Sequence, residues 1–270
     1  MPVIPSGDAE IFYQVIGQGP TVVLLHAFPV NHQFWLPVAH RLASHYRMIL
    51  PDLRGHGRSS PGEGPASMEK HAADLARLLD HAEVSRAALM GASLGGYVLF
   101  EFWRRDPQRF AALGLWNTKA QSDSGEAKAG REKAAEDVLE RGTAPFFESM
   151  LPKLMGRSTH ASRPDLVEGA LAMMHDMSRG AVAQVQRGMA SRPDSGAILK
   201  TIHLPTLVIT GEEDGLTGPS EAEFLHRNIG GSQLRVIARA GHYAPWEQPE
   251  PASQLLRQFL DSSLDRGGTH

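Results

Sequence analysis

Short apolar runs bounded by turn residues recur along the chain. They predict seven buried strands, at residues 11–16, 21–25, 47–50, 87–90, 111–116, 205–210 and 234–237. Several runs, such as 22–25 and 87–90, are apolar without strict alternation of apolar and polar positions. Strands covered by helices on both faces show this pattern, so parallel pairing is favoured. Gly17, Gly19 and Pro20 separate the first two runs in the manner of a hairpin turn.

Segments whose apolar residues repeat about every 3.6 positions lie between these strands. They predict helices at residues 34–44, 68–81, 94–105 and 251–260. Residues 94–105 are apolar on almost every side, which indicates a helix buried at the centre of the fold. Strands that alternate with helices predict an α/β fold with a doubly wound, mostly parallel sheet.

Residues 119–198 interrupt this alternation, because they contain no convincing strand. Three stretches have helical composition or periodicity, at residues 126–141, 144–155 and 164–192. We therefore expect a helical cap at residues 119–198, inserted into an α/β core formed by residues 1–118 and 199–270. The last residues, 265–270, are expected to fray.

The composition excludes several classes of protein. The chain has 270 residues and no cysteine, so it has no disulfide, thiolate metal site or cysteine nucleophile. Its formal net charge is −3 and it has no basic stripe, which argues against nucleic acid as a partner. The longest apolar-leaning stretch, residues 22–30, is far below the roughly 20 residues of a membrane span. Residues 1–10 lack a signal-peptide pattern, so a cytoplasmic protein without membrane contact is expected.

The segment from Gly91 to Gly95 reads Gly-Ala-Ser-Leu-Gly, which fits the pattern G-x-S-x-G. It follows a predicted strand and opens a predicted helix, which is the setting of a sharp turn that exposes a nucleophilic serine. So tight a turn leaves no room for side chains two positions before and two after Ser93, where both residues are glycine. Partial positive charge at the helix start favours an anion that develops there. We therefore predict that Ser93 is a nucleophile.

His242 is the candidate general base. It lies on a loop directly after the last predicted strand, and the carboxyl ends of strands are where open α/β sheets bind ligands. The preceding strand is followed by three acidic residues, Glu212, Glu213 and Asp214. Asp214 is favoured as the group that orients His242, and Glu213 and Glu212 are the alternatives. Asn117, which follows another predicted strand, has no carboxylate to offer.

Two backbone amides are candidates for stabilising an oxyanion. One belongs to Leu94, directly after the predicted nucleophile. The other belongs to Phe28, in the loop after the second predicted strand, where the chain reads His-Ala-Phe-Pro. In this loop we expect His26 to pack and hydrogen-bond rather than to react, and Pro29 to stiffen the turn.

Together these motifs resemble those of the α/β-hydrolase superfamily in order and spacing. They are found at residues 26–29, 52–59, 91–96, 211–214 and 241–242. The resemblance spans nearly the whole chain except the inserted segment, and the subgroup looks like small bacterial carboxylesterases, 3-oxoadipate enol-lactonases and cofactor-free haloperoxidases or perhydrolases. It implies an eight-stranded sheet and a Ser–His–Asp triad without cofactor or metal. The residues of the 52–59 turn that it implies to be structural are Asp52, Arg54, His56 and Ser59.

Two positions depart from the pattern of the superfamily. Ala27 stands where the oxyanion loop usually has glycine, and Gly215 stands where proline often follows the acid. An alanine is costly where the backbone needs a positive φ, and a glycine loosens the loop that carries the acid. Neither change removes a catalytic atom.

The inserted helices are expected to determine the choice of substrate. Apolar candidates for a pocket lining in this segment are Phe146, Phe147, Met150, Met173, Met174 and Met177. Weaker candidates beside the motifs are Trp35, Trp116, Leu216 and Tyr243. The helical spacing of the last three methionines also fits simple packing within the cap.

These residues lead to a hypothesis with alternatives. The lead is a serine hydrolase that cleaves a carboxylic ester or lactone of a small, largely apolar substrate through an acyl-enzyme. A carbon–carbon bond hydrolase or a perhydrolase would use the same triad, whereas epoxide hydrolases and haloalkane dehalogenases need an aspartate nucleophile. The alternative of another class is a ligand-binding receptor with slow turnover. The oligomeric state, monomer or homodimer, is left open.

Overall fold

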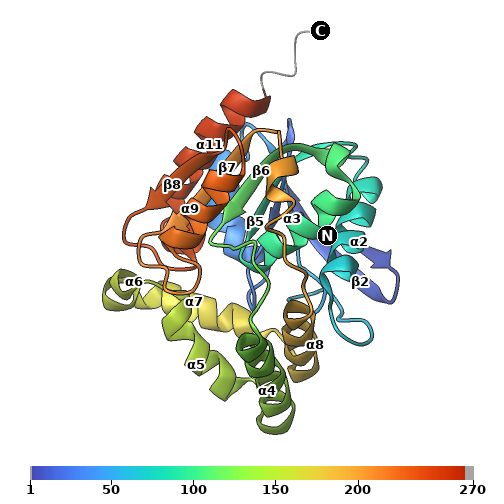
Figure 1. The fold of residues 1–270 in the computed structure, drawn as a ribbon, viewed down its shortest axis with the longest axis vertical. Coiled ribbons are helices and arrows are strands. Elements are labelled where there is room, and N and C mark those ends of the chain that lie inside the picture. The colour runs from blue at the N-terminus through green and yellow to red at the C-terminus, as the bar shows by residue number, and fades with distance from the viewer. Residues whose placement is uncertain (1, 265–270) are drawn as a thin grey trace.

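An eight-stranded sheet forms the centre of the computed structural model, which describes residues 2–264 (Figure 1). Its strands are β1 (Val3–Ser6), β2 (Ala9–Ile16), β3 (Thr21–Leu25), β4 (Arg47–Pro51), β5 (Ala87–Ala92), β6 (Phe110–Trp116), β7 (Thr206–Gly211) and β8 (Gln233–Ile237). They lie in the order β1-β2-β4-β3-β5-β6-β7-β8. The pairs β1–β2 and β2–β4 are antiparallel, and the pairs from β4–β3 to β7–β8 are parallel. The expected doubly wound, mostly parallel sheet is confirmed.

The first part of the sheet differs from the expectation in two respects. β1 was not predicted, because four residues are too few to display an alternating pattern. β2 pairs with β4 and not with β3, so the turn between β2 and β3 is not a hairpin. Gly17 serves a close approach instead, since a Cβ atom on it would lie 2.3 Å from the Ala43 oxygen. The expected fraying of residues 265–270 lies outside the described residues.

Helices cover both faces of the sheet. They are α1 (Leu36–Leu42), α2 (Met68–His81), α3 (Leu94–Arg105), α9 (Pro219–Asn228), α10 (Ala244–Glu247) and α11 (Pro249–Leu264), with 3-10 turns at His32–Trp35, Pro107–Arg109 and Leu199–Thr201. α1 packs on α11, and α2 packs on α3. The helix predicted at 34–44 is divided into the 3-10 turn at His32–Trp35 and α1. The short helices α9 and α10 were not predicted, because charged residues obscure the apolar period of α9 and the four residues of α10 are too few to show one.

α3 is the buried central helix that its sequence predicted. Its residues from Leu94 to Phe102 are all buried, including Glu101. The helix ends where Arg104 and Arg105 reach the surface region, which suits the partial negative charge at a helix C-terminus. The residue before α3 is Ser93, so the fold holds the start of this helix at the carboxyl edge of β5.

Five helices are inserted between β6 and β7. They are α4 (Gly125–Arg141), α5 (Ala144–Leu154), α6 (Arg157–Ser162), α7 (Pro164–His175) and α8 (Arg179–Ala190), and they lie together below the sheet in Figure 1. α4 packs on α8, and α5 packs on α7. The helix predicted at 164–192 is divided, because the Ser178 hydroxyl accepts a hydrogen bond from the Ala181 amide and caps a new helix.

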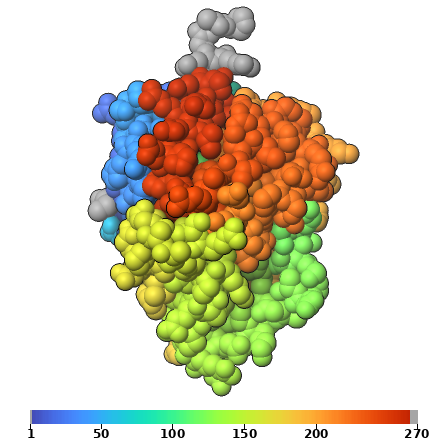
Figure 2. Space-filling model, turned by 90° about the vertical axis from the view of Figure 1, so that its left-hand side faces the viewer, coloured from blue at the N-terminus to red at the C-terminus, as the bar shows by residue number. Residues whose placement is uncertain are grey.

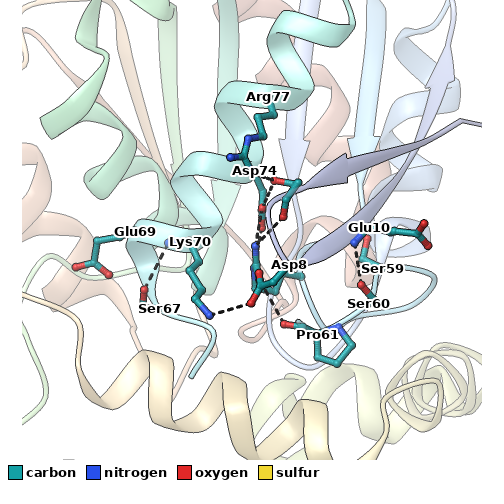
Figure 3. A network of polar contacts seen from close by, with 12 residues as sticks. Asp8, Glu10, Ser59, Ser60, Pro61, Ser67, Glu69, Lys70, Asp74 and Arg77 are labelled. Carbon is teal, nitrogen blue, oxygen red and sulfur yellow. Dashed lines mark hydrogen bonds and ion pairs between the residues drawn. The ribbon is translucent and has the colours of Figure 1, made fainter. Parts of the chain in front are cut away.

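An ion network, buried at Arg54 and Asp74 and open to the surface at Asp8, ties the N-terminal strands to α2 and to the loop after β4. The Arg54 guanidinium lies 2.6 Å from Asp8 Oδ1 and 2.8 Å from Asp74 Oδ1. Lys70 also contacts Asp8 (Figure 3). The hydrogen bond from Arg54 holds the pKa of Asp8 well below its usual range, whereas burial raises the pKa of Asp74. The Ser6 hydroxyl donates to Asp74. This network supports the expected structural role of Arg54.

Two kinds of feature do not occur within residues 2–264. None of the helices there has the length and apolar character needed to cross a bilayer. The histidine and carboxylate side chains of the same residues form no group of three or more that would hold a metal ion.

Candidate active site

Ser93 occupies the turn between β5 and α3. Its backbone has φ +50° and ψ −108°, a conformation that costs a residue with a side chain about 1–3 kcal/mol. A Cβ atom on Gly91 would lie 2.4 Å from the Gly95 carbonyl carbon, and one on Gly95 would lie 2.5 Å from the Leu25 oxygen. Both glycines are therefore required by close backbone contact. The tight turn that the motif predicts is present, and Ser93 is half-buried in it.

The end of β6 fixes the backbone of Ser93. The Ser93 amide donates to the Trp116 oxygen at 2.9 Å, and the Thr118 hydroxyl donates to the Ser93 oxygen at 2.9 Å. Among the described residues, the Ser93 hydroxyl itself has no hydrogen-bond partner. Catalytic hydrogen bonds are often long or poorly aligned before a substrate binds, so this geometry is compatible with a nucleophile at rest.

His242 and Asp214 meet at the same edge of the sheet. His242 follows β8 and Asp214 follows β7, and these strands are parallel neighbours. His242 Nδ1 lies 3.0 Å from Asp214 Oδ2, and both side chains are buried. A proton on Nδ1 satisfies this contact, which leaves Nε2 as the basic nitrogen of the ring.

Hydrogen bonds surround the Asp214 carboxylate. Its Oδ1 accepts from the amides of Leu216 at 2.8 Å and Thr217 at 3.1 Å. Its Oδ2 accepts from the Asn117 amide group at 2.9 Å and from the Thr217 hydroxyl at 3.0 Å. Burial alone would raise the pKa of Asp214, but the attraction of His242 and these hydrogen bonds lower it well below its ordinary value. Asp214 is therefore ionised throughout the neutral pH range.

Asn117 connects the acid to the histidine loop, a role that the sequence analysis did not assign. It follows β6, and its Nδ2 donates both to Asp214 Oδ2 and to the Gly241 oxygen, at 2.9 and 3.2 Å. Its φ of +45° lies in the left-handed region, which asparagine tolerates better than most residues. The available signal was a polar residue at the carboxyl end of a buried strand.

The two other acidic residues of the β7 loop contact different partners. Glu213 accepts hydrogen bonds from the amide and hydroxyl of Ser158, at 2.9 and 2.5 Å. Glu212 accepts from the Arg239 amide at 3.1 Å. Of the three candidate carboxylates, Asp214 is the one hydrogen-bonded to His242.

The two candidate oxyanion donors lie on adjacent parts of the fold. Phe28 follows β3 and Leu94 follows β5, and these strands are paired so that Leu25 is opposite Gly91. Within residues 2–264, the backbone N–H groups of Phe28 and Leu94 donate no hydrogen bond to another residue. The Tyr243 hydroxyl donates to the Phe28 oxygen at 3.1 Å and so anchors the peptide group that follows Phe28.

His26 has the packing role that the sequence predicted. One ring nitrogen contacts the Ala27 oxygen at 2.8 Å, and the other accepts from the Leu53 amide at 2.9 Å. The ring thereby joins the Phe28 loop to the loop after β4. Burial lowers the pKa of His26 to about 4, so the ring is neutral near pH 7.

Several candidate lining residues are packed in the interior. Trp35, Trp116 and Tyr243 are fully buried, and the rings of Trp35 and Trp116 pack edge to face at 5.3 Å between centroids. The buried candidates of the inserted segment are Phe147, Met173, Met174 and Met177. Such burial fits packing between helices.

Three candidates are more accessible. Phe146 is partly buried, and its ring centroid lies 6.2 Å from that of Phe28. Met150, one turn further along α5, is also partly buried. Leu216 is 44% exposed and lines an open groove of about 570 Å³ beside Asp214. Among the candidate lining residues of the inserted segment, Phe146 is the one whose ring packs near the Phe28 ring.

Known proteins match this chain over almost its full length. The family model described as alpha/beta hydrolase fold matches residues 20–249. The curated protein 3-oxoadipate enol-lactonase 2 of Acinetobacter baylyi is 29% identical over 265 residues, which cover 95% of each chain. A thermophilic esterase from Thermogutta terrifontis has a solved structure that is 39% identical, with a TM-score of 0.92 and 94% of each chain covered. The enol-lactonase from Burkholderia xenovorans LB400 shares the fold at 23% identity, with a TM-score of 0.90 over 96% of this chain and 100% of that one.

Proposed function

Because this chain belongs to the α/β-hydrolase fold family, we propose that it is a serine hydrolase of carboxylic esters or lactones. Ser93 is the nucleophile, His242 the general base and Asp214 the group that orients the histidine. The observation that carries the proposal is the buried contact of 3.0 Å between His242 Nδ1 and Asp214 Oδ2, at the sheet edge where the strained Ser93 turn lies. The similarity to an esterase and to an enol-lactonase supports the same class of reaction.

Each group has one task in the first half of the reaction. The Ser93 oxygen forms a bond to the substrate carbonyl carbon while its proton passes to His242 Nε2. The electron pair of the carbonyl bond moves to its oxygen, which becomes an oxyanion. When the carbonyl re-forms, the bond to the leaving oxygen breaks, and that oxygen takes the proton from His242. The ionised Asp214 stabilises the imidazolium between these steps.

Water completes the cycle in the second half. It attacks the acyl-enzyme while His242 accepts one of its protons, and that proton returns to Ser93 as the acid leaves. The amides of Phe28 and Leu94 donate to the oxyanion in both halves. Removal of one such donor typically costs about 10²–10³ in kcat, so a shift of the Phe28 peptide is sufficient to abolish most activity.

Residues 119–198 act as a cap over this site. The Tyr243 amide donates to the Leu154 oxygen at 3.0 Å, and the Asn31 side chain donates to Asp176 at 2.9 Å, so the insertion contacts the loops of both the histidine and the oxyanion donors. Figure 2 shows the inserted helices directly against the C-terminal part of the chain. We assign the remaining segments, 1–118 and 199–270, to the catalytic core.

The substrate is a small ester or lactone with an apolar group beside the reacting carbonyl. Phe28 and Phe146 present aromatic rings at the junction of cap and core, and Met150 adds an adaptable side chain on the same helix. Apolar surface at this junction favours burial of an alkyl or aryl group over a charged one.

The test is hydrolysis of p-nitrophenyl acetate, p-nitrophenyl butyrate and a panel of lactones. Ser93→Ala is expected to lose nearly all activity, because the acyl-enzyme no longer forms. Ser262→Ala, at an exposed serine of α11, is the matched control and should retain the wild-type rate. A fluorophosphonate probe should label the wild type at Ser93 and leave Ser93→Ala unlabelled. Full activity of Ser93→Ala would contradict the proposal, and one labelling event without sustained turnover would favour a receptor.

A further inference from the structure

Glu247 is a buried carboxylate that the proposed reaction does not use. It is the last residue of α10 and only 2% exposed. Its Oε1 accepts hydrogen bonds from the amides of Gly241 at 2.9 Å and Tyr243 at 3.2 Å. These two residues flank His242, so Glu247 holds the backbone on both sides of the proposed base.

The other oxygen of Glu247 contacts the inserted segment. Its Oε2 accepts from the Gly156 amide at 2.7 Å and from the Thr159 hydroxyl at 2.5 Å. Gly156 precedes α6 and Thr159 lies within it, and we refer to residues 156–159 as the α6 turn. One carboxylate therefore joins the histidine loop to the α6 turn through four hydrogen bonds.

The loop that carries the acid is attached to the same turn. Glu213, adjacent to Asp214, accepts from both the amide and the hydroxyl of Ser158. The Glu213 amide in turn donates to the Ala240 oxygen at 2.8 Å, two residues before His242. The α6 turn is thus the common contact of the two loops that supply the histidine and its orienting acid.

The backbones of the histidine loop and the α6 turn are in close contact. A Cβ atom on Gly241 would lie 2.3 Å from the Gly156 nitrogen, so the two backbones touch. The Gly156 position is equally tight, since a Cβ atom there would lie 2.9 Å from the Gly241 nitrogen. Any shift of the α6 turn must therefore move the backbone next to His242.

The charge of Glu247 is matched by donors rather than by a cation. Burial raises its pKa, and the hydrogen bonds from Thr159, Gly156, Gly241 and Tyr243 oppose that rise. A glutamine of the same shape presents one carbonyl oxygen and one NH₂ group. Its NH₂ group cannot accept hydrogen bonds, so two of the four donors would lose their acceptor, either those of the histidine loop or those of the α6 turn. Glu247→Gln therefore breaks half of the junction without changing its volume.

We propose that Glu247 is a positioning residue that fixes the His242 loop against the α6 turn, so that the imidazole is held in line with Ser93 and Asp214. The inference rests on the proposed serine mechanism, in which His242 must accept the proton of Ser93. Displacement of a reacting group by about 1 Å costs roughly 10²-fold in rate. Loosening of the loop therefore acts on kcat, while substrate binding by the apolar surfaces is preserved.

The first experiment compares Glu247→Gln with Glu250→Gln, a matched change at an exposed residue of α11. Steady-state hydrolysis of p-nitrophenyl butyrate should show a kcat at least about tenfold lower for Glu247→Gln, with KM changed less than about threefold. Glu250→Gln should match the wild type in both constants. A folded Glu247→Gln variant with wild-type kcat, or with its whole loss in KM, would overturn the inference.

A second measurement does not depend on turnover. The proton shared by His242 Nδ1 and Asp214 gives a downfield NMR resonance, which should broaden or vanish in Glu247→Gln and persist in Ser93→Ala and Glu250→Gln. An unchanged resonance in Glu247→Gln would refute the positioning role. Wild-type activity in Ser93→Ala would instead refute the serine mechanism, so the two failures are distinguishable.

A milder pair of variants covers the case in which Glu247→Gln does not fold. Thr159→Val removes the single hydroxyl bonded to Oε2, whereas Thr159→Ser keeps it. A net hydrogen bond of about 0.5–1.5 kcal/mol corresponds to roughly a two- to tenfold lower kcat for Thr159→Val. Thr159→Ser should restore the wild-type value. Equal kcat in Thr159→Val and Thr159→Ser would overturn the inference, whether or not Glu247→Gln folds.

Discussion

At the scale of single residues, the candidate site depends on polar side chains that satisfy several partners at once. Asp214 takes hydrogen bonds from three different loops, and Asn117 donates to two of them. Because of these shared hydrogen bonds, the position of each loop depends on the loops next to it. A substitution at one residue is therefore expected to affect the geometry of the others.

The role of Asn117 is open to a direct test. Asn117→Gly keeps the freedom for a positive φ but removes both hydrogen bonds, whereas Asn117→Ala also strains the backbone. Loss of a hydrogen bond to a charged acceptor costs about 1.5–3 kcal/mol, so both variants should be less stable to urea and slower in ester hydrolysis. Wild-type activity in Asn117→Gly would mean that Asn117 serves the backbone conformation alone.

At the scale of elements, the turn from β5 into α3 determines the position of Ser93, the proposed nucleophile. α3 begins so close to β3 that its first turn admits only glycine at Gly95. The buried helix then anchors this position over several turns. The precision of the site thus comes from packing between a helix and the sheet, and not from the serine itself.

Two glycine substitutions in helices should have opposite effects. Gly95→Ala pushes a methyl group against the Leu25 backbone and should destabilise the protein by about 1–3 kcal/mol and abolish activity. Gly130→Ala in α4, where a Cβ atom would meet nothing within 4 Å, should stabilise by about 0.5–1 kcal/mol and leave activity intact. Urea unfolding and ester hydrolysis measure both. Equal stability of the two variants would contradict this account of the turn.

The sequence predicted the elements with long apolar runs and the motifs at their ends. It therefore located the central strands and α3, and it singled out the three residues that we propose to be catalytic. It did not predict β1 or the pairing of β2 with β4, because strand order depends on contacts between segments distant in the chain. Asn117 and Glu247 were not assigned roles for the same reason. Their hydrogen bonds reach residues 97 and 91 positions away, and no local pattern encodes such contacts.

At the scale of the whole molecule, buried histidines make stability depend on pH. His26, His56 and His71 are fully buried, and both ring nitrogens of His71 lack a hydrogen-bond partner within the described residues. Burial lowers the pKa of His26 to about 4, that of His71 to about 3, and that of His56 well below its ordinary value. In the unfolded chain these rings bind protons near the ordinary value of about 6.5.

Stability should therefore fall as the pH is lowered from about 6.5 towards 4, because the unfolded chain binds more protons there. Each such histidine contributes up to about 1.4 kcal/mol per pH unit. His71→Leu should flatten this dependence and be at least as stable at pH 7, since it removes unpaired buried nitrogens. His203→Leu, at an exposed position, is the control. Urea unfolding across this pH range measures the slopes, and equal slopes in His71→Leu and the wild type would contradict the prediction.

The insertion between β6 and β7 leaves and re-enters the sheet through adjacent strands, with Leu113 opposite Thr206. The whole insertion could thus be replaced by another segment without changing the order of the strands in the sheet. Under the proposal that residues 119–198 cap the site, a helical module transplanted from another member of the family is expected to change the substrate range and to leave the chemistry unchanged. The graft would succeed only if it reproduced the amides and hydroxyls that now face Glu213 and Glu247. Any replacement segment would therefore have to supply hydrogen-bond donors to these two carboxylates.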